Sequence, residues 1–213
     1  MDITIIGTGN LGRGIGTRLV KGGHHLTLIN DDKVRASVLA DELRKSSAPN
    51  ANVAVSSYEE GVHDDIVILA VWYPVNLSVA ERLKDQLAGK LVIDIANPLN
   101  DTFDGLATQP GSSSAEELAR ALPESRVVKA FNTTFAGTLE NGEVAGQPLD
   151  VFIAGDDADA KAEVADLVRS GGLHPVDAGP LSRAQQLEGL GFLGISLQRP
   201  HDLGFMSGWK LVS

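Results

Sequence analysis

The sequence contains no cysteine among its 213 residues. Disulfide bonds, thiolate nucleophiles and thiolate metal sites are therefore excluded. Histidine is also scarce and scattered, and the adjacent pair His24 and His25 would point in different directions on any helix or strand. No histidines are spaced as a metal-binding pair, so we expect no metal site.

Long apolar segments and an excess of positive charge are missing as well. The longest wholly apolar run, Ile66 to Tyr73, is far too short to span a bilayer. No leader precedes the first predicted strand, so we expect no secretory signal. The net charge of −10 argues against nucleic acid or an anionic membrane as the main partner. With 43% hydrophobic and 22% charged residues, the composition favours a cytoplasmic globular protein.

Glycine is concentrated near the start of the chain, between a predicted strand and a predicted helix. The strand Ile3–Ile6 leads into a G-x-G-x-x-G loop, a helix follows to about Lys21, and the next strand is Leu26–Ile29. The loop residues are Gly7, Thr8, Gly9, Asn10, Leu11 and Gly12. In this context the glycines allow a tight turn, close approach to a pyrophosphate and close helix packing. The helix N-terminus would present unpaired N–H groups to the phosphates. The alternative is a glycine-rich turn with only a structural role.

Strands and helices alternate along the rest of the chain. The strands are predicted at 53–55, 66–71, 91–95, 127–131, 150–154 and 175–177, and polar or amphipathic helices separate most of them. This alternation predicts an α/β fold with a Rossmann-type, doubly wound parallel sheet. We expect residues 1–213 to form one NAD(P)-binding domain, with a small C-terminal helical lobe from about residue 181. We further predict a brief helix near residues 58–60, a mobile loop over 99–114 and a capping box formed by Ser182 and Gln185.

Ligands bind such sheets beyond the carboxyl ends of the strands, so the residues after each strand are the candidates for a site. Asn30, Asp31 and Asp32 end the second strand, where a carboxylate can accept hydrogen bonds from the adenosine ribose. The alternative is that Asp31 and Asp32 only cap the next helix. The carboxylates would repel a 2′-phosphate, which Lys33 and Arg35 could partly offset, and on charge the sequence favours NAD(H).

Other strand ends carry aromatic and amide side chains. Trp72 either belongs to the core or wall of a cleft or contacts the ligand, and Asn97, held extended by Pro98, either binds the ligand or satisfies its own loop. Lys129 is interpreted as solvated or ion-paired rather than catalytic. No acid or base stands out at these ends, and we assign no catalytic residue, with Asn97 and Asn132 the nearest candidates. Hydride transfer between two stacked rings needs alignment rather than a proton donor.

Several segments together resemble a known family. They are Gly7–Gly12, Val128–Thr133, Ala154–Asp157 and Asp177–Leu181. The chain resembles the NADP oxidoreductases that use the deazaflavin coenzyme F-420, and also the cytosolic domain of the STEAP metalloreductases. The resemblance implies hydride transfer between a nicotinamide and a flavin or deazaflavin, and commonly a homodimer.

The resemblance also assigns residues to the two halves of the site. Thr8 to Gly12 would hold the pyrophosphate. Val71, Trp72 and Asn97 would border the nicotinamide, and Asn132, Thr133, Thr134 and Phe135 would face the acceptor. Two positions depart from the archaeal members: Asn30–Asp32 replaces Ser-Arg-Arg, and Asn132 replaces a histidine and matches the flavin-using STEAP type.

Three functions remain open from the sequence. The leading one is an oxidoreductase that transfers a hydride between NAD(P)H and a flavin or F-420-like small-molecule acceptor. The second is an NAD(P)H-dependent reductase of a small carbonyl or imine, although related enzymes add a long helical domain and few residues follow Pro180. The third is a dinucleotide-binding sensor without turnover.

The last predicted helix contains Gly189, Gly191 and Gly194, which lower its helix propensity. Such glycines persist where another backbone must come close. We therefore expect a homodimer whose interface includes residues 182–205, with Gly194 near its symmetry mate and the partner helping to wall the acceptor cleft. The alternative is that these glycines pack on the subunit's own sheet.

Overall fold

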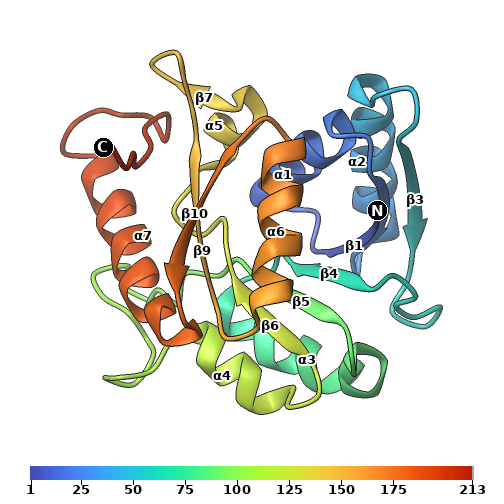
Figure 1. The fold of residues 1–213 in the computed structure, drawn as a ribbon, viewed down its shortest axis with the longest axis horizontal. Coiled ribbons are helices and arrows are strands. Elements are labelled where there is room, and N and C mark those ends of the chain that lie inside the picture. The colour runs from blue at the N-terminus through green and yellow to red at the C-terminus, as the bar shows by residue number, and fades with distance from the viewer. Residues whose placement is uncertain (213) are drawn as a thin grey trace.

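A central eight-stranded sheet organises the computed structural model, which describes residues 1–212 (Figure 1). The strand order is β10-β9-β6-β5-β4-β1-β2-β3. The strands are β1 (Asp2–Ile6), β2 (His25–Ile29), β3 (Asn52–Ser56), β4 (Ile66–Leu69), β5 (Leu91–Asp94), β6 (Arg126–Lys129), β9 (Asp150–Gly155) and β10 (His174–Gly179). A separate hairpin is formed by β7 (Glu143–Val144) and β8 (Gln147–Pro148).

The order of β1 to β6 is that of a Rossmann fold, and these strands pair in parallel. The predicted fold class is therefore confirmed. One detail of the prediction is wrong, because β9 pairs antiparallel with β6 and β10 then runs parallel to β9. The carboxyl ends of β9 and β10 consequently lie at the opposite edge from those of the other strands, away from the glycine loop.

Helices cover both faces of the sheet, which explains why the strands are apolar on both sides. In β4, Ile66 and Ile68 join one core cluster, whereas Val67 and Leu69 join the other. The first cluster includes α1 (Asn10–Lys21), α2 (Lys33–Ser46), α5 (Ala136–Asn141) and α6 (Ala158–Ser170). The second includes α3 (Tyr73–Leu87) and α4 (Ser114–Ala121).

Two local predictions are wrong. Residues 58–60 form a turn rather than a brief helix, closed by a hydrogen bond from the Gly61 amide to the Ser57 carbonyl. The capping box of Ser182 and Gln185 is absent, because a 3-10 turn, η1 (Leu181–Arg183), precedes α7 (Ala184–Gln198). The Gln185 side chain instead donates to Glu116 on α4 at 3.0 Å. The first part of the predicted 99–114 loop is closed by a bridge between Leu99 and Leu106, and the mobility of the loop stays a prediction.

The glycines of α7 pack within their own subunit at two positions. A Cβ at Gly191 would overlap the Asn97 amide, and one at Gly194 would lie 3.1 Å from Trp209 and 3.6 Å from Phe135. Gly194 is therefore covered by the chain's own C-terminal segment, and the expected contact between Gly194 and its symmetry mate is wrong. The alternative is right in placing these two glycines within their own subunit, but they pack on Asn97, beyond the end of β5, and on Trp209 and Phe135 rather than on the sheet itself.

Candidate active site

The glycine loop lies at the carboxyl end of β1, between β1 and α1, as the motif predicts. Gly7 has a φ of +103°, and a Cβ there would overlap the carbonyl of Ala70 after β4. A Cβ at Gly12 would overlap the carbonyl of Gly7. Gly9 differs, since nothing lies within 4 Å of its would-be Cβ. Gly7 and Gly12 thus shape the turn, and Gly9 leaves open space where a pyrophosphate would approach the backbone.

The start of α1 is suited to an anion. Gly9 caps the helix without a side chain, and no acidic residue lies in the first turn. The first backbone N–H groups and the positive end of the helix dipole are therefore left for a ligand. The Thr8 hydroxyl is buried without a hydrogen-bond partner in the described chain, which adds a polar group at the same place. The loop fits the phosphates of a dinucleotide.

The residues after β2 divide between capping and the site. Asp32 caps α2 by accepting from the Val34 amide at 2.9 Å, and Asn30 accepts from the Asp32 amide at 2.9 Å. Asp31 takes no part in capping, and its side chain is 82% exposed. The capping interpretation therefore holds for Asp32 alone, and Asp31 stays available to a ribose. Lys33 lies 3.6 Å from Glu60 and is partly neutralised there.

After β4, Val71 is half-buried and Trp72 is 69% exposed, so Trp72 is not a core residue. Its ring meets Phe103 edge-on, with the centroids 6.3 Å apart. Phe103 comes from the 99–113 loop and is itself 54% exposed. Two large aromatic rings therefore stand in solvent near the carboxyl end of β4, on the side where the nicotinamide is expected.

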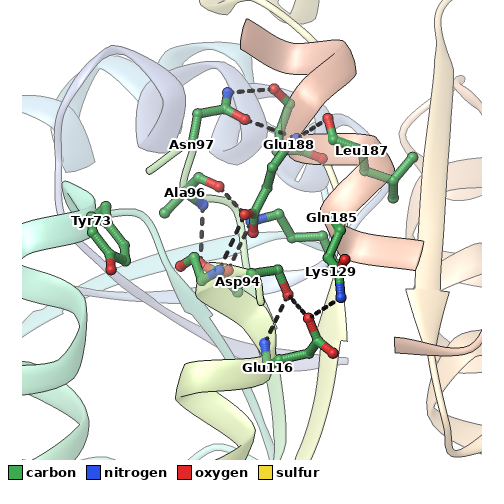
Figure 2. A network of polar contacts seen from close by, with 12 residues as sticks. Tyr73, Asp94, Ala96, Asn97, Glu116, Lys129, Gln185, Leu187 and Glu188 are labelled. Carbon is green, nitrogen blue, oxygen red and sulfur yellow. Dashed lines mark hydrogen bonds and ion pairs between the residues drawn. The ribbon is translucent and has the colours of Figure 1, made fainter. Parts of the chain in front are cut away.

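The ends of β5 and β6 are joined by two asparagines, which we call the amide pair. Asn97 donates to the Asn132 carbonyl at 2.7 Å, and Asn132 donates to the Asn97 side-chain oxygen at 2.9 Å and to the Leu187 carbonyl at 2.8 Å (Figure 2). The Asn97 side chain therefore satisfies a neighbouring strand end rather than its own loop. Its role in ligand binding stays a prediction. Pro98, buried beside it, holds the segment extended.

The backbone at the end of β6 is strained. Phe131 is buried and has a φ of 63°, a conformation that costs a bulky residue about 1–3 kcal/mol. The turn carries Asn132, Thr133 and Thr134, all buried, and the half-buried Phe135. Thr134 bonds to the Phe131 carbonyl at 2.6 Å, whereas the Asn132 side-chain oxygen and the Thr133 hydroxyl have no partner within the described chain. Such strain and unpaired polar atoms are typical of a binding site.

A buried ionic triad underlies the amide pair. Lys129 lies 2.9 Å from Asp94 and 2.7 Å from Glu188, with all three side chains fully buried, and it also donates to the Ala96 carbonyl (Figure 2). All three ammonium hydrogens are used, so Lys129 has no lone pair to act as a base or nucleophile. The ion-paired interpretation of Lys129 is confirmed, and the solvated one is wrong.

Neighbouring N–H groups also donate hydrogen bonds to both carboxylates. Asn76 donates to Asp94 at 2.9 Å, the Ala96 amide donates to it at 3.0 Å, and the Ser114 amide donates to Glu188 at 3.1 Å. Burial raises the pKa of Glu188 although Lys129 opposes it, and burial lowers the pKa of Lys129 less than Asp94 and Glu188 raise it. The triad places two carboxyl groups and one ammonium group beneath the expected nicotinamide site.

Tyr73 is an ionisable group close to this network. Its hydroxyl donates to Glu117 at 2.8 Å, and burial together with Glu117 raises its pKa to about 12. A phenol with this pKa is a poor proton donor at neutral pH. The carboxyl edge therefore presents amides, hydroxyls and aromatic rings rather than a general acid.

Two residues of this region had no signal in the sequence. Glu188 lies in the last helix and enters the triad from a distant part of the chain, and Arg82 on α3 reaches the end of β2. Between residues 1 and 212 no group of three His, Asp or Glu side chains is arranged to hold a metal ion. In the same part of the chain, no helix has the length and apolar character needed to cross a membrane.

The sheet order, the glycine loop and the open helix N-terminus define a dinucleotide-binding protein of the Rossmann class. Comparisons with known proteins specify the class further. The family model for NADP oxidoreductase, coenzyme F420-dependent, matches residues 2–98. The F420-dependent NADP reductase of Methanocaldococcus jannaschii is 31% identical, with 92% of each chain covered. The chain belongs to this family of NADP-dependent oxidoreductases.

Two further similarities agree with this assignment. The metalloreductase STEAP3 of Rattus norvegicus is 32% identical over 88% of this chain, which spans 36% of the length of that relative. A crystal structure of a candidate F420-dependent NADP reductase from Arthrobacter sp. FB24 has a TM-score of 0.83 and 28% identity, and 99% of each chain is covered. The resemblance noted from the motifs is thereby confirmed.

Proposed function

We propose that this protein transfers a hydride between NAD(P)H and a flavin or deazaflavin acceptor such as an F-420-like coenzyme. The nicotinamide and the acceptor ring supply the redox chemistry, and the protein must align them at roughly 3–3.5 Å between the reacting carbons. The observation that carries the proposal is the polar lining of the carboxyl edge. It offers hydrogen-bonding groups to orient rings but no free proton donor, which matches hydride transfer between two cofactors.

The residues expected to face the acceptor include two that the fold leaves incompletely bonded. The Asn132 side-chain oxygen can accept a hydrogen bond from an N–H group of the acceptor, and the Thr133 hydroxyl can donate or accept one. Asn132 cannot rotate freely, because it is bonded to Asn97 and to the Leu187 carbonyl. We propose that Asn97 and Trp72, with its large exposed ring, border the nicotinamide, and that Asn132, held in place by Asn97, faces the acceptor.

Reduction of a carbonyl or imine receives no support from a specific contact. Such chemistry needs a proton donor beside the substrate. Lys129 is buried with every N–H committed, and the pKa of Tyr73 is raised to about 12. We therefore favour the flavin or deazaflavin acceptor.

We propose a preference for NADH over NADPH, in contrast to the name of the family. Asp31 is exposed and not engaged in capping, so its carboxylate is available to the ribose hydroxyls and would repel a 2′-phosphate. Asp31→Arg should shift the preference towards NADPH. A clear preference of the unmodified protein for NADPH would contradict this part of the proposal.

We also retain the homodimer as a proposal, on a support other than the glycines. Apolar side chains are exposed on α7 and the C-terminal segment: Leu193, Leu203, Phe205, Met206, Leu211 and Val212. A second copy covering them would also lie beside Phe135, which packs on Phe205 with the ring centroids 5.4 Å apart. Sedimentation at micromolar concentration tests the dimer, and a monomer that turns over the acceptor would refute it.

The central experiment follows oxidation of NADH and NADPH spectroscopically with F-420, FMN, FAD and riboflavin as separate acceptors. We expect turnover with at least one of them. The test variant is Asn132→Leu. Leucine is close to asparagine in size, but it removes both the hydrogen bonds and the unpaired oxygen. Turnover of the wild-type protein with none of the four acceptors, despite tight NADH binding, would argue for a sensor instead.

A further inference from the structure

Arg82 of α3 lies at the centre of a charged cluster beyond the ends of β2 and β3. Its guanidinium carbon is 4.2 Å from the centroid of the Tyr58 ring. One terminal nitrogen donates to Glu59 at 3.1 Å, and the other lies 3.8 Å from Asp31. Tyr58 is only 9% exposed, so the ring on which the guanidinium stacks is part of the core.

These contacts add little to stability, which makes a functional role worth testing. The side chains of Arg82 and Asp31 are 49% and 82% exposed. Exposed ion pairs contribute little to stability, and the stacking on Tyr58 adds little more. The cluster instead fixes the orientation of the Arg82 guanidinium. This planar group is stacked on a ring and bonded at one edge to Glu59, so it presents its other edge towards Asp31.

Asp31 is the partner whose position matters. It occupies the place after the second strand where a carboxylate accepts hydrogen bonds from the adenosine ribose. Apart from Arg82, whose terminal nitrogen lies 3.8 Å from the carboxylate, no side chain in the described structure lies within hydrogen-bonding or ion-pairing distance of it. Arg82 is therefore the group that restricts where this carboxylate points.

The charge of the cluster disfavours a phosphate. Asp31, Asp32, Glu59 and Glu60 outnumber the three cations Lys33, Arg35 and Arg82. Two of those cations are engaged, Lys33 with Glu60 and Arg82 with Glu59 and Asp31. A 2′-phosphate would meet a rim with a net negative charge, whereas a neutral diol would meet an acceptor that is already positioned.

We propose that Arg82 is a positioning residue that holds Asp31 for the 2′,3′-diol of the adenosine ribose, and that the Asp31–Arg82 pair selects NAD(H) over NADP(H). The inference rests on the proposed function, in which the glycine loop binds a dinucleotide. It assigns the selection of NAD(H) over NADP(H) to Arg82 of α3 in addition to Asp31 at the end of β2.

Binding, rather than turnover, tests the inference. NADH, NADPH and reduced nicotinamide mononucleotide, which lacks the adenosine, are titrated by fluorescence against the wild-type protein, Arg82→Ala, Arg82→Lys, Asp31→Ala and the Arg82→Ala/Asp31→Ala double variant. Arg82→Ala should weaken NADH binding about threefold to tenfold. Arg82→Lys should weaken it similarly, because an ammonium cannot stack on Tyr58 and bridge two carboxylates. The loss should disappear in the Asp31→Ala background.

Two controls separate a local effect from a general one. Binding of the mononucleotide should be unchanged in every variant. Arg169→Ala should leave binding of all three ligands unaffected, since Arg169 is an exposed arginine paired with Asp166 on α6, away from the cluster.

Three results would overturn the inference. One is a wild-type preference for NADPH that is lost in Arg82→Ala while NADH binding is unchanged, because Arg82 would then bind the 2′-phosphate. Another is an unchanged Kd for NADH in Arg82→Ala, and the third is an equal loss with and without Asp31. A wild-type protein that binds neither NADH nor NADPH would instead refute the proposed function itself.

Discussion

Replacing Lys129 with methionine removes the cation of the buried triad while keeping most of the side-chain volume. Asp94 and Glu188 would then face each other, fully buried, without a counter-charge. Breaking a buried ion pair by removing one partner costs about 3–5 kcal/mol. For a protein of this size, 1 kcal/mol shifts the melting temperature by about 2–4 °C, so we expect a fall of about 6–20 °C.

The matched control is Lys161→Met. Lys161 is also bonded to an aspartate, Asp177 at 2.9 Å, but that carboxylate is 64% exposed. Its loss should cost below about 1 kcal/mol. Thermal unfolding at pH 7 compares the two variants, and adding Glu188→Gln to Lys129→Met should restore part of the lost stability. Equal destabilisation by Lys129→Met and Lys161→Met would refute the view that the triad is an electrostatic unit.

The pH dependence provides a second measurement of the same variant. In the wild-type protein the pKa of Lys129 is raised by Asp94 and Glu188 in spite of burial, so its contribution to stability is complete below about pH 10.4 and is lost as the pH rises through the raised pKa. In Lys129→Met, Glu188 would lose the cation that opposes the effect of burial, so it would bind its proton more tightly when folded than when unfolded. Stability of the variant should therefore fall as the pH rises from about 4 through the raised pKa of Glu188. A variant whose stability is independent of pH between 4 and 8 would contradict this reasoning.

Three further predictions concern the glycines and the C-terminus. Gly9→Val should weaken NADH binding at least tenfold with little change in melting temperature, whereas Gly7→Ala should cost about 2 kcal/mol or more, because Gly7 has a φ of +103° and no space for a Cβ. Gly191→Ala should displace the amide pair and slow hydride transfer at least tenfold in single-turnover measurements, and an unchanged rate would show that the pair does not orient the ring. Lys210→Met should move acid unfolding to higher pH. Burial alone would raise the pKa of Asp150, but hydrogen bonds from Lys210, the Leu211 amide and His174 hold it below its usual range, and the stability that this provides is lost as the pH falls.

The parts of the fold that were predictable depend on short stretches of sequence. The glycine loop needs one strand, one turn and one helix start, all within residues 3–21, and the structure places them as predicted. The buried parallel strands were recognisable because they are apolar on both faces. The direction of β9 was not, because whether a strand runs parallel or antiparallel to its neighbour depends on the path of the connection rather than on its own residues. Similarly, Ser182 and Gln185 satisfy the capping pattern, but contacts with α4 take the Gln185 side chain elsewhere.

The same difference between local sequence patterns and contacts made only in the packed chain explains which site residues could be predicted. Thr8, Asp31 and Asn97 were identified because each follows a strand, and strand ends meet at one edge of the sheet. Glu188 follows no strand, and its role depends on α7 crossing the ends of β5 and β6, so only the packed chain brings it 2.7 Å from Lys129.

Gly191 affects both the amide pair and the buried triad. It lets α7 approach Asn97 so closely that no side chain fits between them, and the same helix turn carries Glu188 into the triad and presents the Leu187 carbonyl to Asn132. The last helix thus fixes the polar lining of the site from behind, through an ion pair below the amide pair and a hydrogen bond beside it. This explains why the helix retains glycine at a cost of about 1 kcal/mol in propensity. It follows that α7 acts on the orientation of the site within its own subunit, whether or not a second subunit covers its outer face.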